Sequence, residues 1–589
     1  MKPKTLTKIT FRSYRDMPDN CVSMGDMGWN RTGSWRYVRP IYTHRTPPCT
    51  QGCPSGTAIE RWMGYVAKGE YEKALETIRM EHPSPAILGR VCFHPCESHC
   101  NRSKMEGSVG INMLERHIGD MTANAPPAPP HDVPAVEALR VAVVGSGPAG
   151  LGAAYHLRRL GHEVEVFERM PALGGMLRYG IPSYRLPKDV LDAELDRIGR
   201  MGIRFHTGVA PQVSDLFQQG FHRVFLAFGA QRSRRLGVPG DEHPSVLPGL
   251  RFLSDVAQGV RTEVPVKVYV VGGGNTAIDA ARAALRLGAD VTILYRRTRQ
   301  EMPAFEEEIE AALAEGVRIE YLVAPSQVDD ESGLAAMTCI RMELGEPGPD
   351  GRRKPEPVAG SEFRLPAGLV LSAIGEEAEL DLAPELANER GSLATDEEMR
   401  TSDPRVWAGG DMTDSPRTVI DAIASGKRAA IAIDCEARGL SFREVLKRIR
   451  VPDCPGLSME TYLRVLREGI EAVEPVPEVA GYELLNTFYF DELARQRRPE
   501  QEPKDRTSGF MEVHPDISEE IAISEAMRCL HCGNCISCDN CFIYCPDAVI
   551  TPMGDGSYLI DYDYCKGCGV CVHECPRAAM EMIPERAEV

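Results

Sequence analysis

The sequence feature that most constrains the fold is a glycine-rich turn in VAVVGSGPAGLGAAYHLRRLG, residues 141–161, where an apolar run meets a small-residue segment. Gly145, Gly147 and Gly150 have the G-x-G-x-x-G spacing, which allows a tight turn, close approach of a pyrophosphate and close packing of helix on strand. The phosphates would lie at the helix N-terminus, where free N–H groups favour negative charge. Glu168 ends the next apolar strand, where a carboxylate can accept hydrogen bonds from a ribose. This order of elements predicts a dinucleotide-binding unit.

A second unit of the same plan follows in KVYVVGGGNTAIDAARAALRLGADVTILYRR, residues 267–297. Gly272, Gly274 and Ala277 form a G-x-G-x-x-A turn between its first strand and its helix. The repeat is strong evidence for two dinucleotide sites in one chain.

Arg296 and Arg297 stand where the first unit has Glu168. Two guanidinium groups can pair with the 2′-phosphate of NADPH, and no carboxylate is present to bind a 2′-hydroxyl. The alternative is that the arginines form a solvated strand end. The sequence therefore favours NADPH and leaves NADH open.

The chain then returns with two apolar strands, LVLSAIG at residues 369–375 and VWAGGD at residues 406–411. Asp411 follows a Gly-Gly pair, and a small-residue helix starts soon after it. This would place a short acid and a helix N-terminus against the ribityl and phosphate groups of a flavin. We expect the second nucleotide domain to be inserted into the first.

The 19 cysteines point to metal ligation, because the N-terminus lacks the apolar core of a secretory signal. No apolar run is long enough to cross a bilayer, and we expect a cytoplasmic protein. The formal charge of −18 argues against nucleic acid as a partner. Five cysteines flank a helical segment near the N-terminus and are candidate iron–sulfur ligands, with buried structural thiols as the alternative: Cys49, Cys53, Cys92, Cys96 and Cys100.

The C-terminal region carries two C-x2-C-x2-C-x3-C-P runs, which are the signature of a two-cluster ferredoxin. In such modules the fourth cysteine of each run ligates the other cluster. One cluster would take Cys535, Cys538, Cys541 and Cys575, and the other would take Cys565, Cys568, Cys571 and Cys545.

Together, the motifs GRVCxxxCExxC, GSGPAGL, GGMLRYGIP, GGGNTAID and AGGD resemble those of the two-dinucleotide iron–sulfur flavoprotein reductases. These include the small subunit of bacterial glutamate synthase and the matching part of dihydropyrimidine dehydrogenase. The resemblance covers roughly residues 45–440. It implies FAD, NADH or NADPH, and two N-terminal 4Fe-4S clusters.

By this resemblance, Cys53, Cys92 and Cys96 would bind one N-terminal cluster, and Glu115 in INMLERHI would occupy the position of its fourth ligand. Cys49 and Cys100 would belong to the other cluster. The family supplies two further ligands from an R-C-x-x-C-G segment just before Cys49, where this chain has isoleucine and histidine.

The same R-C-x-x-C-G pattern occurs near the other end of the chain, where it contains Cys529 and Cys532. We expect these cysteines to complete the cluster of Cys49 and Cys100, so that the C-terminal part docks on the N-terminal domain. Four clusters then need sixteen ligands, which fifteen cysteines and Glu115 supply. The alternative is that Cys529 and Cys532 bind a separate metal or none.

The expected fold class is α/β, with two nested Rossmann-like domains between an N-terminal helical iron–sulfur domain and a C-terminal α+β bacterial ferredoxin domain. The expected boundaries are 1–136 for the helical domain, 137–262 and 376–440 for the FAD-binding domain, 263–375 for the nicotinamide domain, 441–527 for an extended connector and 528–589 for the ferredoxin. The candidate cofactor-binding residues are Gly145, Gly147, Ala149, Gly150, Glu168, Arg169, Gly175, Met176, Leu177, Val209, Gly229, Gly273, Gly274, Asn275, Thr276, Arg296, Arg297, Gly410, Asp411 and Thr418.

These parts imply an NAD(P)H:acceptor oxidoreductase that passes electrons through FAD and four 4Fe-4S clusters to or from a protein partner. Hydride transfer between nicotinamide and flavin needs no protein acid or base, so no catalytic side chain is expected. The opening segment, residues 6–40, together with the ferredoxin tail, is similar to the DsrL iron–sulfur flavoproteins encoded beside dissimilatory sulfite reductase. That resemblance implies this reductase as the partner, in sulfur metabolism.

Two alternatives stay open. One is a glutamate-synthase-type or ferredoxin-linked electron-transfer subunit for another partner. The other is a non-enzymatic redox-sensing or assembly protein. Self-association into a homodimer is also left open.

Overall fold

The computed structural model describes residues 31–331, 334–348, 351–386, 388 and 392–585. These residues form two compact units. The larger unit contains residues 49–476 and 493–529, and the smaller one contains the described residues before 49, residues 477–492 and those from 530 onward. No helix among the described residues combines the length and the hydropathy that crossing a membrane requires.

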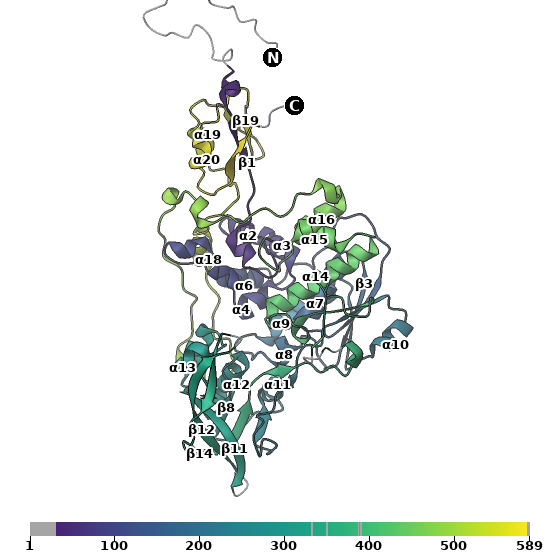
Figure 1. Ribbon diagram of the computed structural model, residues 1–589, viewed down its shortest axis with the longest axis vertical. Coiled ribbons are helices and arrows are strands. Elements are labelled where there is room, and N and C mark those ends of the chain that lie inside the picture. Colours follow the sequence, from purple (N-terminus) through teal and green to yellow (C-terminus); the bar gives the residue numbers. More distant parts are fainter. Residues whose placement is uncertain (1–30, 332–333, 349–350, 387, 389–391, 586–589) are drawn as a thin grey trace, which may run out of the picture. The chain divides into compact units, whose positions relative to one another are not determined.

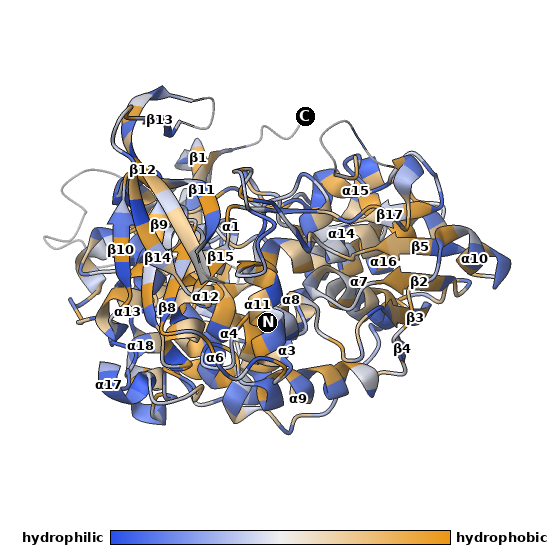
Figure 2. Ribbon diagram, turned by 90° about the horizontal axis from the view of Figure 1, so that it is seen from below, coloured by the Kyte–Doolittle hydropathy of each residue, from blue (hydrophilic) through white to orange (hydrophobic). Residues whose placement is uncertain are grey.

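A five-stranded parallel sheet of order β17-β5-β2-β3-β4 forms the first nucleotide domain of the larger unit (Figure 1 labels β3, and Figure 2 labels all five strands). Its strands are β2 (Arg140–Val144), β3 (Glu163–Glu168), β4 (Arg204–Thr207), β5 (Arg223–Leu226) and β17 (Val406–Ala408). The predicted return of the chain is visible in β17, which pairs with β5. The other strand predicted to take part in the return, at residues 369–375, instead pairs within the sheet of the second domain. Strands β2 and β5 consist largely of apolar residues (Figure 2), because helices cover the sheet and bury their side chains.

The second nucleotide domain has a parallel sheet of order β10-β9-β8-β15-β7. Its strands are β7 (Val246–Pro248), β8 (Lys267–Val271), β9 (Asp290–Tyr295), β10 (Arg318–Tyr321) and β15 (Leu369–Ser372). Helices α11 (Gly249–Ala257), α12 (Asn275–Arg286) and α13 (Glu306–Glu315) accompany it. Strand β7 and helix α11 precede residue 263, where this domain was expected to begin. An antiparallel sheet of β11 (Val323–Glu331), β12 (Leu334–Pro347), β13 (Arg353–Pro357) and β14 (Phe363–Ala367) is appended to it.

The N-terminal part of the larger unit is helical, as expected. It contains α2 (Ile59–Val66), α3 (Tyr71–Glu81), α4 (Pro85–Val91), α5 (Pro95–Ser98) and α6 (Ile111–Met121). Helix α18 (Glu519–Met527), from late in the chain, packs into the same core through Ala522 and Ala526.

Residues 441–527 are not a purely extended connector. They contain α15 (Phe442–Ile449), α16 (Met459–Glu468), the short α17 (Pro503–Arg506) and α18. The apolar faces of α15 and α16 are buried against Ile431 and Cys435 of α14 (Val419–Ala437). The charged, proline-containing stretch at residues 495–506, which predicted an extended connector, contains only the short α17.

The smaller unit is a small ferredoxin-like module. It contains α19 (Asn540–Ile543), α20 (Val570–His573) and the paired strands β18 (Ile550–Pro552) and β19 (Tyr558–Ile560). Strand β1 (Val38–Tyr42) pairs antiparallel with β20 (Met580–Pro584). Residues 38–42, which were expected to belong to the N-terminal domain, therefore add a strand to this module.

Helix α7 (Pro148–Arg159), which follows the first glycine turn, crosses α14 at small residues. A Cβ atom on Gly426 of α14 would lie 2.2 Å from the Ala149 carbonyl oxygen and 2.7 Å from the Ala153 nitrogen. A Cβ atom on Gly152 of α7 would lie 2.8 Å from the Ile423 carbonyl oxygen. The two backbones can approach this closely only because glycine stands at both positions.

Replacing Gly426 with valine is expected to lower the midpoint of thermal unfolding by several degrees. The side chain has no space between α7 and α14, and overpacking of this kind costs about 1–3 kcal/mol. The matched control is Gly509→Val, because a Cβ atom at Gly509 meets nothing within 4 Å. Equal midpoints for the two variants, measured by circular dichroism, would contradict the tight helix crossing.

Candidate functional site

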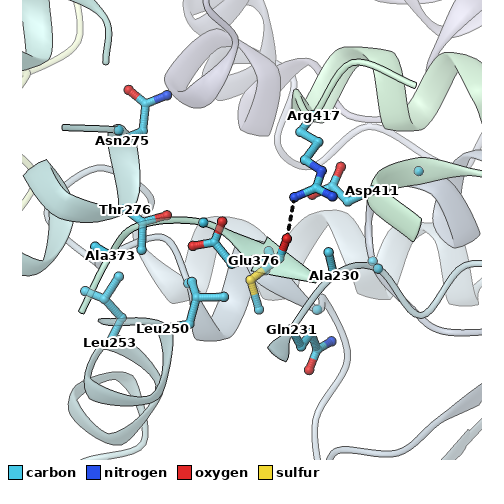
Figure 3. A pocket seen from close by; sticks show the side chains of 18 of the residues that line it. Ala230, Gln231, Leu250, Leu253, Asn275, Thr276, Ala373, Glu376, Asp411 and Arg417 are labelled. Atoms are coloured by element: carbon cyan, nitrogen blue, oxygen red, sulfur yellow. Dashed lines mark hydrogen bonds between the residues drawn. The ribbon is translucent and has the colours of Figure 1, made fainter. Parts of the chain in front are cut away.

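A cavity of about 990 Å³ is lined by the glycine turns of both nucleotide domains. Most of the candidate cofactor-binding residues line it: Gly145, Gly147, Ala149, Glu168, Arg169, Gly175, Met176, Val209, Gly229, Gly273, Gly274, Asn275, Thr276, Arg296, Arg297, Gly410, Asp411 and Thr418. Figure 3 shows Asp411 and Arg417 on one side of the cavity and Asn275 and Thr276 on the other.

Two candidates do not line the cavity. A Cβ atom on Gly150 would lie 1.9 Å from the Gly145 carbonyl oxygen, so this glycine serves the packing of α7 on the turn. Leu177 is buried in the core of the first domain.

Open space lies beside the first turn of each nucleotide helix. Gly147 precedes α7 and Gly274 precedes α12, and a Cβ atom on either would meet nothing within 4 Å. Helix N-termini present free N–H groups and a positive dipole end to such a space. Both turns therefore suit the phosphate groups of a dinucleotide.

Glu168 holds the shape of the first turn. Its Oε2 accepts hydrogen bonds from the Ser146 backbone nitrogen at 3.0 Å and from the Ser146 hydroxyl at 2.6 Å. Its Oε1 accepts a hydrogen bond from the Met170 nitrogen at 2.8 Å. The Gly174 nitrogen donates in turn to the Ser146 hydroxyl at 3.0 Å. Oε2 thus already accepts two hydrogen bonds, whereas Oε1 accepts one and keeps further acceptor capacity for a ribose.

The N-terminus of α14 closes the cavity with charged groups. Burial raises the pKa of Asp411 to about 6, and the nearby Arg417 opposes this shift. Arg417 Nη1 donates a hydrogen bond to the Glu376 carbonyl oxygen at 2.8 Å (Figure 3). Thr418 caps α14, accepting from the Asp421 nitrogen at 3.1 Å. Glu376 and Arg417 also line the cavity and were not predicted, although each lies close in the sequence to a predicted motif.

Arginines gather where the second strand of the nicotinamide domain ends. Arg296, Arg297 and Arg352 all line the cavity. Partial burial lowers the pKa of Arg296, although its side chain keeps access to solvent, and the neighbouring Arg297 and Arg352 lower the pKa further. Arg297 Nε donates to the Arg353 carbonyl oxygen at 2.7 Å, which fixes its direction. A group of guanidiniums that repel one another is suited to an anion with several oxygens.

The first set of N-terminal candidate ligands comes from four separate segments. Cys53 follows α1 (Pro48–Gln51), Cys92 follows α4, Cys96 lies in α5 and Glu115 lies in α6. Burial raises the pKa of Cys92, and the Glu115 carboxylate and Cys53 raise it further. Burial likewise raises the pKa of Cys96, with further contributions from Cys53 and Cys92. Cys53, Cys92, Cys96 and Glu115 therefore lie near enough to one another to interact electrostatically.

Cys49, Cys100 and Cys529 all pack against one core of the larger unit. Arg528 anchors Cys529 there, since its buried guanidinium donates to the Ser108 carbonyl oxygen at 3.0 Å and the Gly107 carbonyl oxygen at 2.6 Å. Cys532 is assigned to the smaller unit.

Phe93 connects the first set of cysteines with the cavity. It follows Cys92 directly in the chain and lines the cavity. Its ring stacks on Phe305 of the nicotinamide domain, with ring centroids 3.3 Å apart. The sequence gives no pattern that predicts this contact.

The smaller unit has two hollows, each lined by four cysteines. Cys535, Cys538, Cys541 and Cys575 line one hollow. Cys545, Cys565, Cys568 and Cys571 line the other. This is the division that the exchanged fourth cysteine of each run predicts. Among the described residues, no three His, Cys, Asp or Glu side chains are placed to hold a single metal ion.

Comparison with protein families matches three parts of the chain. Residues 139–426 match the pyridine nucleotide-disulphide oxidoreductases. Residues 41–126 match domain II of dihydropyrimidine dehydrogenase, which carries a 4Fe-4S cluster. Residues 534–579 match a 4Fe-4S dicluster domain.

The chain is also similar to curated proteins over most of its length. It is 36% identical to the NADP(+)-dependent formate dehydrogenase subunit beta of Moorella thermoacetica, covering 83% of this chain and 70% of that one. It is 35% identical to the NADPH-Fe(3+) oxidoreductase subunit beta of Geobacter sulfurreducens, covering 84% and 77%.

The small chain of the NADPH-dependent glutamate synthase of Escherichia coli is 33% identical, covering 66% of this chain and 88% of that one. Together with the family matches, these relatives support FAD, NAD(P)H and 4Fe-4S clusters as cofactors. The chain belongs to the family of FAD-dependent iron–sulfur NAD(P)H oxidoreductases of the glutamate synthase small-subunit type.

Proposed function

We propose that this protein exchanges electrons between NADPH and a redox protein partner through FAD and four 4Fe-4S clusters. The observation that carries the proposal is that both glycine turns open onto the same cavity. Phe93, which is adjacent to Cys92 in the chain, also lines this cavity. Bound FAD supplies two-electron exchange with a nicotinamide and one-electron exchange with iron–sulfur clusters.

The first nucleotide domain would hold the FAD. Gly147 leaves room for its phosphates at the N-terminus of α7, and Glu168 presents its Oε1 atom to the ribose. Asp411 and the N-terminus of α14 would face its ribityl and phosphate groups. These residues bind and orient the cofactor, and none of them needs to transfer a proton.

The second nucleotide domain would hold NADPH in preference to NADH. The turn before α12 offers its N–H groups to the pyrophosphate, and Arg296 and Arg297 would pair with the 2′-phosphate. Both beta-subunit relatives carry NADP(+) or NADPH in their names.

Two clusters would lie in the helical part of the larger unit. The first cluster would be held by Cys53, Cys92, Cys96 and Glu115. It would lie next to the cavity, because Phe93, which follows Cys92 in the chain, lines the cavity. Cys49, Cys100, Cys529 and Cys532 would hold the second. The anchoring of Arg528 on the loop that follows Cys100 supports this assignment. The remaining two clusters would occupy the hollows of the smaller unit.

The smaller unit would exchange electrons with the partner, because several of its cysteines are exposed, among them Cys535, Cys538 and Cys568. Two relatives are named as beta subunits, which supports assembly with a further protein. Dissimilatory sulfite reductase is the partner we propose, on the resemblance of the opening segment. Residues 6–30 of that segment lie outside the described residues. A glutamate-synthase-type partner is the alternative.

Anaerobic titration of the purified protein with NADPH is expected to bleach the flavin absorbance and then produce electron paramagnetic resonance signals of reduced clusters. Addition of dissimilatory sulfite reductase is expected to reoxidise the clusters, whereas the large subunit of glutamate synthase leaves them reduced. Reoxidation by the glutamate synthase subunit alone would support the alternative partner. A protein purified without flavin would support a redox-sensing or assembly role instead.

Arg296→Ala is expected to raise the KM for NADPH about tenfold, because a charge-assisted hydrogen bond to phosphate contributes about 1.5–3 kcal/mol and Arg296 is exposed. The KM for NADH is expected to change less than about twofold, since NADH lacks the 2′-phosphate. The matched control is Arg299→Ala, which removes a neighbouring guanidinium that pairs with Glu306 and Glu310. An equal rise for both nucleotides would show that Arg296 does not read the 2′-phosphate.

The double substitution Cys529→Ser, Cys532→Ser is expected to reduce the iron content from about sixteen to about twelve atoms per chain, through loss of one four-iron cluster. Cys435→Ala serves as a control, because Cys435 is a buried thiol packed among α14, α15 and α16. Iron content that stays near sixteen in the double variant would favour the alternative, in which these cysteines ligate no cluster.

A further inference from the structure

Tyr42, at the end of β1, lies next to a cysteine of the smaller unit. Its hydroxyl oxygen is 3.2 Å from the Sγ atom of Cys541. Tyr42 lines the same hollow as Cys541 and the other three cysteines of that set. It comes from outside the two ferredoxin cysteine runs, almost 500 residues earlier in the chain.

The position of Tyr42 is fixed by contacts on several sides. Strand β1 pairs with β20, where Tyr42 lies opposite Met580. The Thr43 nitrogen donates to the Ala579 carbonyl oxygen at 3.0 Å, which extends this ladder by one bond. The Tyr42 ring stacks on Tyr558, with centroids 5.9 Å apart and planes at 18°. These contacts already order the Tyr42 side chain, so its hydroxyl loses no further conformational entropy when it bonds to Cys541.

The same face of β1 meets the second set of cysteines through a different residue. Residues two apart along a strand point to the same side, so Pro40 and Tyr42 share a face. Pro40 lines the hollow of Cys545, Cys565, Cys568 and Cys571. Proline has no N–H and its side chain has no donor group. Strand β1 thus presents a hydrogen-bond donor to one set and an apolar ring to the other.

We propose that Tyr42 raises the reduction potential of the cluster held by Cys535, Cys538, Cys541 and Cys575, by donating a hydrogen bond to Cys541 Sγ. This inference rests on the proposed ligation by these four cysteines. A cluster ligand is a thiolate without a proton, so the hydroxyl is the donor. Reduction adds negative charge to the cluster and its sulfurs, and a donor stabilises that charge. The N-terminal strand therefore separates the potentials of two clusters that the duplicated cysteine runs alone would leave similar.

The test is an anaerobic redox titration of the full-length protein, loaded with flavin and clusters and followed by electron paramagnetic resonance. In Tyr42→Phe, one ferredoxin midpoint is expected to fall while the other midpoints stay at their wild-type values. Site-specific 2,3-difluorotyrosine at position 42 is expected to raise the same midpoint, because its more acidic hydroxyl donates a stronger hydrogen bond. The second substitution keeps the hydroxyl as well as the ring, so it decides the matter if Tyr42→Phe loses iron.

Tyr562→Phe is the matched control. The Tyr562 hydroxyl donates to the Pro40 carbonyl oxygen at 2.8 Å, so this variant removes a tyrosine hydroxyl that bonds β1 but no sulfur. Its midpoints are expected to match the wild type. Unchanged midpoints in Tyr42→Phe with full iron content, or an equal shift in Tyr562→Phe, would overturn the inference. If Cys541 does not ligate a cluster, the result is different: the Cys541→Ser protein would keep its full iron content.

Discussion

The cavity depends on the close crossing of α7 and α14. These helices belong to segments of the first nucleotide domain that the whole second domain separates in sequence. Gly152 and Gly426 allow their backbones to meet, so that the turn before α7 and the N-terminus of α14 open onto the same space. Two positive helix ends then face the region where a dinucleotide carries its negative charge. The second domain can be inserted without disrupting this site because, after it, the chain returns to place α14 against α7.

A buried charge network holds the second nucleotide domain against the first. Arg185, from the first domain, lies 2.8 Å from Asp279 of α12. Arg286 pairs with Glu315 at 2.7 Å, and its guanidinium lies 3.8 Å from the centre of the Tyr184 ring. Burial alone would raise the pKa of Glu315, but hydrogen bonds from the arginines of α12 outweigh it and lower the pKa to about 2. Loss of one partner from such a network leaves a buried charge unpaired, which typically costs about 3–5 kcal/mol. The network therefore favours one packing of α12 against the segment that contains Tyr184 and Arg185.

Local patterns in the sequence were enough to predict the nested domains, because each glycine turn lies directly between the strand and the helix that it joins. Long-range placements were not predictable in the same way. The pairing of β1 with β20 joins two short strands from opposite ends of the chain, and neither has a pattern that selects the other. The sequence predicts Glu168 as a ribose ligand. In the structure it also accepts hydrogen bonds from Ser146 and so fixes the turn, a role that depends on tertiary contacts and not on spacing in the sequence. The stacking of Phe93 on Phe305 likewise follows from tertiary packing and not from spacing.

The loop that contains Cys92, Phe93 and His94 is the place where three functional parts meet. Cys92 lies near the other candidate ligands, and Phe93 lines the cavity. His94 Nε2 lies 3.8 Å from Oε1 of Glu307 in the nicotinamide domain. The exchange of electrons with a nicotinamide and their transfer to an iron–sulfur cluster would therefore take place on either side of a single short loop. Because Phe305 packs on Phe93, the nicotinamide domain is in direct contact with this loop. One residue of the nicotinamide domain thus touches the segment that lies between the cavity and the first cysteine set.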